Sequence, residues 1–356
     1  MRRILAFLAA VAAALVVSTQ PAAACAGLIG PNGAVNLLRT TTFAGYHDGV
    51  EHYVTAFKFL GAGGQFGSIV PLPGVPTKVE RGGDWTLQRL VREVQPPIRE
   101  LAATAAGSAS ASADKAQVIL TAKVGALDLT VLSGGGSAVG DWAREHGFAL
   151  PPDAPEVLDF YASRSPIFMA ATFDGEVAAA SGQQIGVGTP IHLTIPTSQP
   201  WVPLRILGLG READERIQAD VFLLTDRRPT LLPVEANPGL TLDRSESASS
   251  SLLSDLHDDK TMGWVPTSSM WLSYLKINSP AGQLKYDLAI DAHGGATPSA
   301  WSAGLGRDQV ALGGQLPPFV PASQTRDDGW SALLVALAIV GGGAGLLGLA
   351  VAIRRT

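Results

Sequence analysis

The chain contains almost no cysteine, the residue that forms the disulfides of small exported domains and builds many redox and zinc sites. Its 356 residues include one cysteine, Cys25. A single cysteine excludes an intrachain disulfide, a Cys-X-X-Cys redox pair and a cysteine-based zinc site. The fold must therefore be held by a hydrophobic core, and the length is sufficient to bury one.

Charge is also scarce. Only 16% of the residues are Asp, Glu, Lys or Arg, against about a quarter in ordinary soluble domains. Four of the 26 basic residues, Arg2, Arg3, Arg354 and Arg355, lie at the two ends, so the rest of the chain is acidic on balance. This balance argues against nucleic acid as a partner. A hydrophobic content of 46% argues against a disordered chain.

The common catalytic motifs are missing. The sequence contains no G-x-S-x-G nucleophile elbow, no H-E-x-x-H helix and no P-loop. Ser112 and Lys115 fit S-x-x-K, but the S-D-N and K-T-G elements that accompany it in penicillin-recognising enzymes are absent, so we interpret the match as coincidence. The sequence therefore names no catalytic, cofactor-binding or metal-ligating residue and no cofactor.

The N-terminal 24 residues have the pattern of a secretory signal peptide. Arg2 and Arg3 precede an apolar stretch from Ile4 to Val17, and small residues end the segment at Ala24. We predict cleavage after Ala24. Cys25 then becomes the first residue of the mature chain, either as an acylated cysteine or as a free thiol.

The C-terminal end carries a long apolar run. Ala332 to Ile353 is 22 residues without a charge, about 33 Å as a helix, which matches a hydrocarbon core of about 30 Å. We predict a transmembrane helix within residues 329–353 and, from Arg354 and Arg355, a cytoplasmic tail at 354–356. The expected location is the bacterial cell membrane, with a single pass and the bulk of the chain extracytoplasmic.

Two glycines lie within that predicted helix at the spacing found in helix dimers. Gly341 and Gly345 form a G-x-x-x-G pair, which permits a homodimer in addition to contact with the lipid bilayer. The same glycines also suit a helix that simply faces lipid, which is the interpretation we favour.

The remaining residues predict one extracytoplasmic domain at 25–293, followed by a Gly/Pro/Ser-rich tether at 294–328. The fold class is α+β, mainly antiparallel β sheet or sandwich with two helical insertions, because the helical patterns do not alternate regularly with strands. We predict a hairpin over 40–59, helices over 87–94, 98–105, 137–146 and 154–163, and strands over 118–123, 127–132, 167–173, 191–195, 202–207, 219–225, 270–277 and 284–290.

The hairpin holds the most suggestive side chains. With Asp48-Gly49 as its two-residue turn, His47 and His52 lie on one face about 7–8 Å apart, and Glu51 points to the other. A zinc site needs a third protein ligand, and His146, His192, His257 and His293 are too scattered for the sequence to choose one. We therefore interpret the hairpin histidines as polar surface residues.

Acidic clusters and tryptophans are two further kinds of candidate binding residues. His257-Asp258-Asp259 and Asp327-Asp328 lack the spaced oxygens of a calcium loop, so we predict a solvated helix end or linker for each. Trp201, Trp264 and Trp271 could line a sugar or peptide groove, but packing in the core or on a sheet is the better prediction.

Several short segments resemble the bacterial family known as domain of unknown function 2330. They are Cys25-Ala26-Gly27, Tyr46-His47-Asp48-Gly49-Val50-Glu51-His52-Tyr53, Val70-Pro71-Leu72-Pro73-Gly74-Val75-Pro76, Pro190-Ile191-His192-Leu193-Thr194 and Val202-Pro203-Leu204-Arg205. The resemblance covers residues 25–230, and Ala26 stands where the family usually has glycine. It implies an exported, membrane-anchored bacterial protein without an assigned activity, and hence no catalytic residues to transfer.

These observations lead to one expectation and one alternative. We expect a single-pass, membrane-anchored extracytoplasmic protein that acts as a non-catalytic binding or envelope-interaction module with an envelope protein as its partner. The alternative is an extracytoplasmic hydrolase or metal-dependent enzyme whose site the sequence does not reveal.

Overall fold

The computed structural model describes residues 22–23, 27–30, 33–34, 39–56, 67–94, 116–174, 177, 189–233 and 239–305. Several predictions fall outside these ranges: the signal peptide up to residue 21, Cys25, the helix over 98–105, the Ser112–Lys115 motif, Asp327-Asp328 and the transmembrane run with Gly341 and Gly345. Within the described residues, no helix has the length and apolar character needed to span a membrane.

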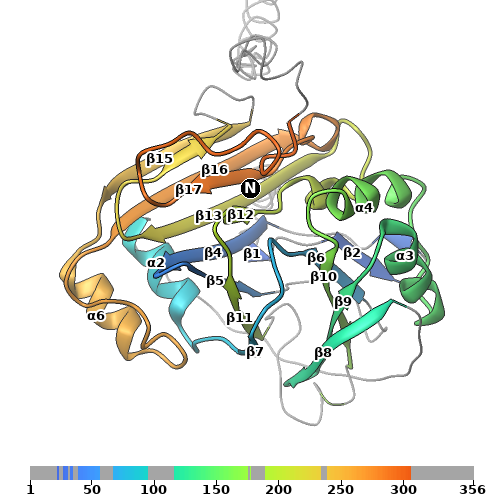
Figure 1. Cartoon of the computed structure of the whole chain (residues 1–356), viewed down its shortest axis with the longest axis horizontal. Helices are drawn as coiled ribbons and strands as arrows, with labels where there is room; N and C mark the ends of the chain where they lie inside the picture. Colours follow the sequence, from blue (N-terminus) through green and yellow to red (C-terminus); the bar gives the residue numbers. More distant parts are fainter. Residues whose placement is uncertain are drawn as a thin grey trace, which may run out of the picture. The chain divides into compact units, whose positions relative to one another are not determined.

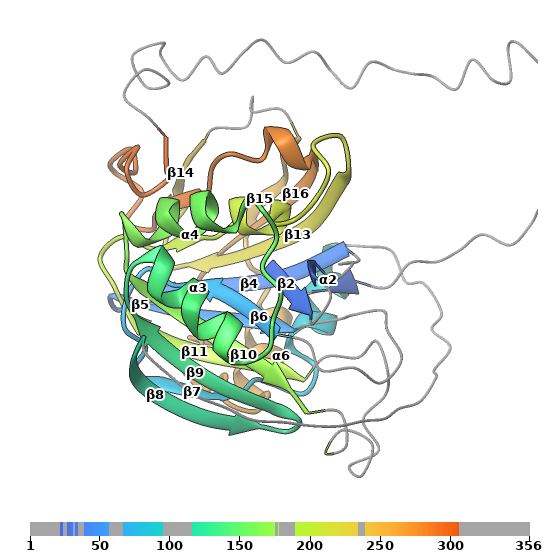
Figure 2. The ribbon, with the colours of Figure 1, turned by 90° about the vertical axis from the view of Figure 1, so that its right-hand side faces the viewer.

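Three β-sheets dominate the described chain (Figures 1 and 2). The first sheet has the order β15 (Leu240–Ser247), β16 (Trp271–Pro280), β13 (Arg216–Thr225), β4 (Arg39–His47), β5 (Val50–Ala56), β11 (Pro190–Pro196) and β7 (Lys78–Arg81), with β1 (Ala22–Ala23) also paired to β4. The second has the order β3 (Gly33–Ala34), β2 (Gly27–Gly30), β6 (Gly67–Pro71), β10 (Ile167–Phe173), β9 (Leu127–Ser133) and β8 (Gln117–Val124). The third has the order β12 (Trp201–Val202), β17 (Leu288–Asp291) and β14 (Thr230–Leu232).

The largest hydrophobic cluster lies between the first two sheets. Tyr53 and Leu193 from the first sheet share it with Val131 and Met169 from the second. Along each strand these core residues alternate with residues that face outward, as period-two strands require. The two sheets therefore form a sandwich whose inner faces make a continuous apolar core.

Helices cover the outer face of each sheet. The helices α2 (Thr86–Val94) and α6 (Ser250–Asp258) pack with Phe43 and Phe222 on the first sheet. The helices α3 (Gly136–Glu145) and α4 (Ala154–Ala162) share a cluster with Ile69 and Phe168 of the second sheet. Figure 1 shows the two helix pairs on opposite sides of the domain. Short 3₁₀ helices at Arg205–Gly208 and Ala281–Gln283 complete the helical elements among the described residues.

The structure agrees with the coarse prediction of an α+β fold built mostly from antiparallel strands. The pairing of β4 with β13 differs from this prediction, since the two strands are parallel. Parallel strands need a long connection, and most of the domain lies between these two in the sequence. The helix α6 was not predicted, since its serine-rich start is typical of a loop. In the structure Ser249 caps this helix by accepting a hydrogen bond from the Leu252 backbone N–H, and Leu252, Leu253 and Leu256 are buried.

Residues 294–305, which the sequence assigns to the tether, lie against the domain. Ala303 is fully buried, and its carbonyl accepts a hydrogen bond from the Asp287 backbone N–H. The Ser302 carbonyl accepts another from the Arg164 guanidinium. The folded domain therefore continues at least to Leu305.

Candidate functional site

The β4–β5 hairpin has the predicted turn and register. Asp48 and Gly49 both have positive φ, 50° and 80°, as a two-residue type I′ turn requires. His47 pairs with Val50, and His52 pairs with Gly45, so both histidines lie on the outer face of the first sheet. The prediction that they share a face is confirmed.

At the tip of this hairpin His47 lies between two carboxylates. Its Nδ1 is 2.6 Å from Asp226 Oδ1, and its Nε2 is 3.4 Å from Asp48 Oδ2. Asp226 directly follows β13, whose Thr225 pairs with Tyr46 of β4. We refer to His47, Asp48 and Asp226 as the hairpin-tip cluster. It is solvent-facing, with 28% of the His47 side chain and 87% of the Asp48 side chain exposed.

The second hairpin histidine has a different partner. His52 Nδ1 is 2.9 Å from Nε2 of His192, which lies on the neighbouring strand β11. We refer to His52 and His192 as the imidazole pair. Both are buried. The sequence missed this pair because 140 residues separate the two histidines, and only the pairing of β5 with β11 brings them together.

Trp264 covers the imidazole pair. Its ring stacks on that of His52, with the centroids 3.9 Å apart and the planes within 4°. Gly45 provides the space for the indole, since a Cβ at this position would overlap the Trp264 ring. Trp264 therefore closes the outer side of His52, and Gly45 is required for that closure.

Changing Gly45 to alanine is expected to displace Trp264 and to lower the free energy of unfolding by about 1–3 kcal/mol, the usual cost of overpacking. Urea unfolding followed by tryptophan fluorescence measures both effects. Gly263→Ala is the matched control, because a Cβ there meets open space next to the same tryptophan. Equal stabilities for the two variants would contradict the packing shown here.

Burial keeps the imidazole pair neutral. It lowers the pKa of both histidines, and for His52 the neighbouring His192 and His47 lower it further. For His192, Glu80 opposes this effect, while Lys78 reinforces it. The Glu80 Oε1 atom is 3.9 Å from His192 Nδ1, too far for a hydrogen bond. The pair therefore acts as a neutral N–H···N contact rather than as a charged group.

The lowered pKa values predict a loss of stability in acid. As the pH falls below 6.5, the ordinary value for histidine, the unfolded chain takes up protons that the folded imidazole pair does not bind. Stability should therefore fall with decreasing pH below 6.5, and His192→Gln should make that fall shallower. Urea midpoints at a series of pH values test this, and identical slopes for the two proteins would refute it.

A buried carboxyl group lies on the opposite face of the same hairpin. Glu51 is fully buried, and neither of its oxygens makes a hydrogen bond of good geometry among the described residues. Burial raises its pKa from 4.5 to about 8, although an interaction with the Trp201 backbone opposes the rise. Glu51 is therefore a neutral acid near pH 7, and its predicted orientation away from His47 and His52 is confirmed.

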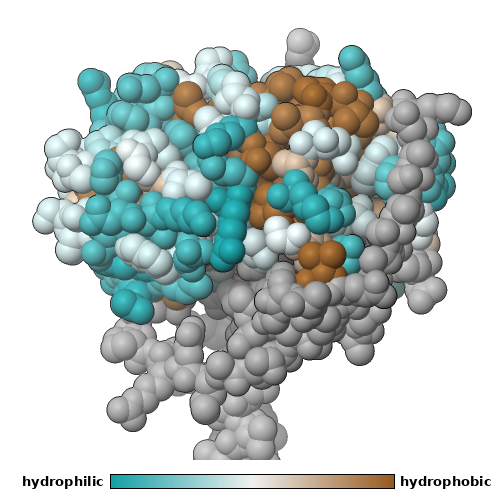
Figure 3. Space-filling model, turned by 90° about the horizontal axis from the view of Figure 1, so that it is seen from below, coloured by the Kyte–Doolittle hydropathy of each residue, from teal (hydrophilic) through white to brown (hydrophobic). Residues whose placement is uncertain are grey.

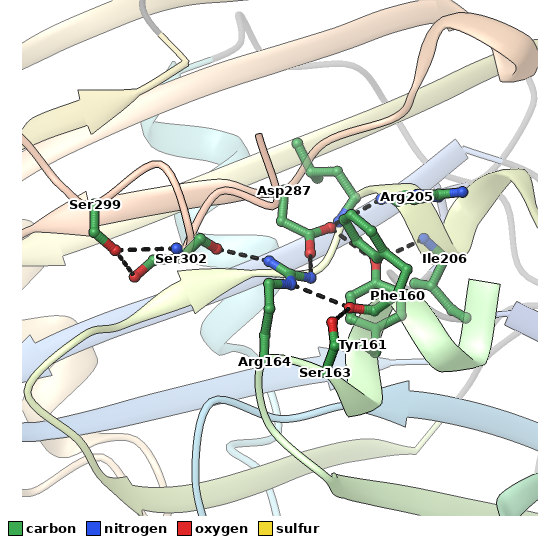
Figure 4. A network of polar contacts seen from close by, with 10 residues as sticks. Phe160, Tyr161, Ser163, Arg164, Arg205, Ile206, Asp287, Ser299 and Ser302 are labelled. Atoms are coloured by element: carbon green, nitrogen blue, oxygen red, sulfur yellow. Dashed lines mark hydrogen bonds and ion pairs between the residues drawn. The ribbon is translucent and has the colours of Figure 1, made fainter. Parts of the chain in front are cut away.

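A buried polar network centres on the carboxylate of Asp287 (Figure 4). The carboxylate of Asp287 accepts hydrogen bonds from the Arg164 guanidinium, the Tyr161 hydroxyl and the backbone N–H groups of Leu204 and Arg205. Asp287 and Arg164 are 0% and 3% exposed in their side chains. Because its oxygens are saturated with donors, we interpret this network as structural, joining α4 to the segment before β17.

The remaining histidines belong neither to the hairpin-tip cluster nor to the imidazole pair. His146 caps the end of α3 and stacks on Trp142 at 3.8 Å. His257 Nδ1 contacts the Val265 carbonyl at 2.7 Å, and His293 lies 3.6 Å from Asp291.

The acidic cluster at the end of α6 has a structural role. Asp259 is buried rather than solvated, which differs from the predicted helix end in water. Its carboxylate accepts hydrogen bonds from the backbone N–H groups of Asp84 and Trp85 and from the Thr86 hydroxyl. Asp259 therefore caps the start of α2.

The three tryptophans do not line one groove. Trp201 is buried below Arg164 in the cluster with α3 and α4, whereas Trp264 belongs to the cluster with α2 and α6. Trp271 donates a hydrogen bond from Nε1 to Ser245 on the neighbouring strand β15. Packing in the core and on the sheets accounts for all three.

The chain matches a protein-family model. The model of a family described as an uncharacterized protein conserved in bacteria (DUF2330) matches residues 19–232. The match includes the hairpin, the imidazole pair and Asp226. No curated protein matches the chain.

Similarity to solved structures is weak. A chain of the caspase-8/P35 complex covers 71% of this chain and 96% of its own, with 8% identity and a TM-score of 0.36. A mutated baculovirus P35 after caspase cleavage has a TM-score of 0.35 at 8% identity, over 71% of this chain and 99% of its own. At these values neither fold nor activity is transferred.

Proposed function

The chain belongs to the DUF2330 family of bacterial proteins, and we propose that it is an exported, membrane-anchored protein whose extracytoplasmic domain is a non-catalytic binding module for an envelope protein. The signal-like segment 1–24 and the uncharged run 332–353 support export and anchoring. In this proposal the lipid bilayer holds the C-terminal helix, and the β-sandwich faces away from the cytoplasm.

The binding role is supported mainly by exposed apolar side chains on the outer strand of the second sheet. β8 is the last strand in the order of that sheet, and Val118 and Ile119 on it are 43% and 39% exposed. Further along the same strand, Leu120 and Ala122 pack against the core. Figure 3 views the domain from the side where β7 and β8 lie in Figure 1, and apolar side chains gather on part of this face.

A terminal strand of this kind suits one mode of recognition. An extended segment of another protein adds to such an edge through backbone hydrogen bonds, and exposed apolar side chains then pack against it. The register with β9 shifts between Val118 and Leu120, so Ile119 has no partner residue on β9. We therefore propose that an extended apolar segment of an envelope protein pairs with β8.

A photo-crosslinking amino acid placed at position 118 tests this role in intact cells. We expect an adduct of one defined mass, and we expect it to be lost when Ile119 is also changed to lysine. The same crosslinker at Arg144, which is 58% exposed on α3, is the matched control. Equal adducts at positions 118 and 144, or no adduct at either, would contradict the binding role of β8.

A metal-dependent enzyme is the second candidate function. The hairpin-tip cluster favours it, since three groups that bind metals converge there. An enzyme of this kind would show turnover of an ester, peptide or glycoside substrate that depends on His47. Absence of such turnover across these substrate classes would remove this candidate.

A further inference from the structure

We propose that the hairpin-tip cluster is a site for one divalent transition-metal ion of the zinc and manganese class, with His47, Asp48 and Asp226 as its protein ligands. This site is independent of the proposed contact through β8. The argument rests on the distances within the cluster, on its charge and on the way the sheet holds it.

The distances fit a shared ion. One ligand atom from each of the three residues lies within 4.8 Å of the other two. Ligand bonds of about 2.0–2.2 Å place any two ligand atoms of one ion at most about 4.4 Å apart. One ion binds a single imidazole nitrogen. Asp226 already faces Nδ1, whereas Asp48 lies near Nε2, so an ion at Nδ1 requires the exposed Asp48 carboxylate to rotate toward it.

The charges within the cluster call for a cation. Among the ion pairs of the described residues, Asp48 and Asp226 have His47 as their shared partner and no lysine or arginine. Other surface carboxylates differ, since Asp243 pairs with Lys276 at 2.8 Å.

The scaffold places the backbones of the ligands before an ion arrives. The type I′ turn fixes the backbones of His47 and Asp48, and the pairing of β13 with β4 places Asp226 beside them. Binding then has to order only side-chain rotations, which favours affinity. His52 takes no part, because its Nδ1 is already bonded to His192.

The donor set selects the class of ion. One imidazole nitrogen with two carboxylate oxygens suits zinc or manganese, whereas calcium prefers oxygen ligands alone and needs six or more. Three protein ligands leave positions for water, as in open metal sites. A carboxylate or histidine of another protein can also occupy one of these open coordination positions.

Zinc binding to the full chain in detergent tests the proposal. Isothermal titration with metal analysis should give one ion per chain. His47→Gln and Asp226→Asn should each weaken binding by at least about 10-fold, since changes behind the ligands alone cost about 10–100-fold. Asp243→Asn is the matched control and should bind as the unmodified chain does. Urea unfolding of each variant shows that the domain remains folded.

Three results would overturn the site. They are no zinc bound, zinc bound equally by His47→Gln and the unmodified chain, and displacement of zinc by equimolar calcium. None of them bears on the crosslinking at position 118, so failure of the metal site and failure of the binding module remain distinguishable.

Discussion

Replacing Asp287 by asparagine is expected to lower the free energy of unfolding by about 3–5 kcal/mol, the usual cost of breaking a buried ion pair. The change leaves the Arg164 guanidinium buried without its charge partner, since only 3% of that side chain is exposed. The Tyr161 hydroxyl and the Leu204 backbone N–H both donate to the Asp287 carboxylate. In the variant these donors face an amide, which carries no charge and has one oxygen instead of two. Urea unfolding at pH 7 measures the loss.

The exposed ion pair on α3 provides the control. Asp141 and Arg144 have more than half of each side chain exposed, so Asp141→Asn should cost no more than about 1 kcal/mol. If Asp287→Asn cost as little as Asp141→Asn, the network in Figure 4 would not stabilise the domain as its geometry indicates.

Replacing Glu51 by glutamine is expected to stabilise the domain increasingly as the pH rises from 4.5 to 8. The pKa of Glu51 is about 8 in the folded chain and 4.5 in the unfolded chain. Between these values the unfolded chain releases a proton that the folded chain keeps, so stability falls by about 1.4 kcal/mol per pH unit, or roughly 5 kcal/mol over the range. Glu51→Gln removes this dependence.

Unfolding free energies from pH 4.5 to 8 provide the measurement. The curves of Glu51→Gln and of the unmodified chain should diverge with rising pH, whereas Glu246→Gln, with 53% of that side chain exposed, should run parallel to the unmodified chain. Parallel curves for Glu51→Gln would mean that Glu51 is not a neutral buried acid. Below pH 6.5 the two histidines of the imidazole pair outweigh Glu51, and above pH 6.5 only Glu51 contributes, so the three groups together predict maximal stability near pH 6.5.

Local patterns predicted the hairpin and the strands β8, β9, β10, β11, β13 and β16. The predicted strands at 202–207 and 284–290 overlap only β12 and β17, because a 3₁₀ helix takes up part of the first and residues 284–287 form no strand. Asp48-Gly49 between two β-rich runs requires a type I′ turn, and that turn fixes the register, which in turn fixes the faces of His47, Glu51 and His52. The helices α3 and α4 follow equally local signals. These elements depend on contacts between near neighbours in the sequence.

The partners of the hairpin histidines could not be predicted. His192 and Asp226 lie 140 and 179 residues beyond the histidines that they contact. Only the strand order of the first sheet, with β11 on one side of the hairpin and β13 on the other, brings them together. Sequence reasoning thus singled out His47 and His52 without a third ligand, whereas the structure groups His47 with Asp48 and Asp226 and places His52 beside His192.

The helix α6 was missed for a different reason. Its serine-rich start has weak helix propensity, and Ser249 functions as a cap. Burial of Leu252, Leu253 and Leu256 against the first sheet then stabilises the helix. Tertiary packing, rather than local preference, determines this element.

Protease treatment of intact and opened cells tests the central proposal most directly. With an epitope tag after Thr356, external protease should digest the domain at 39–305 while a short tagged C-terminal fragment stays protected in the membrane. Digestion of the tag by external protease, or survival of the domain until the cells are opened, would contradict an exported protein held by its C-terminal helix.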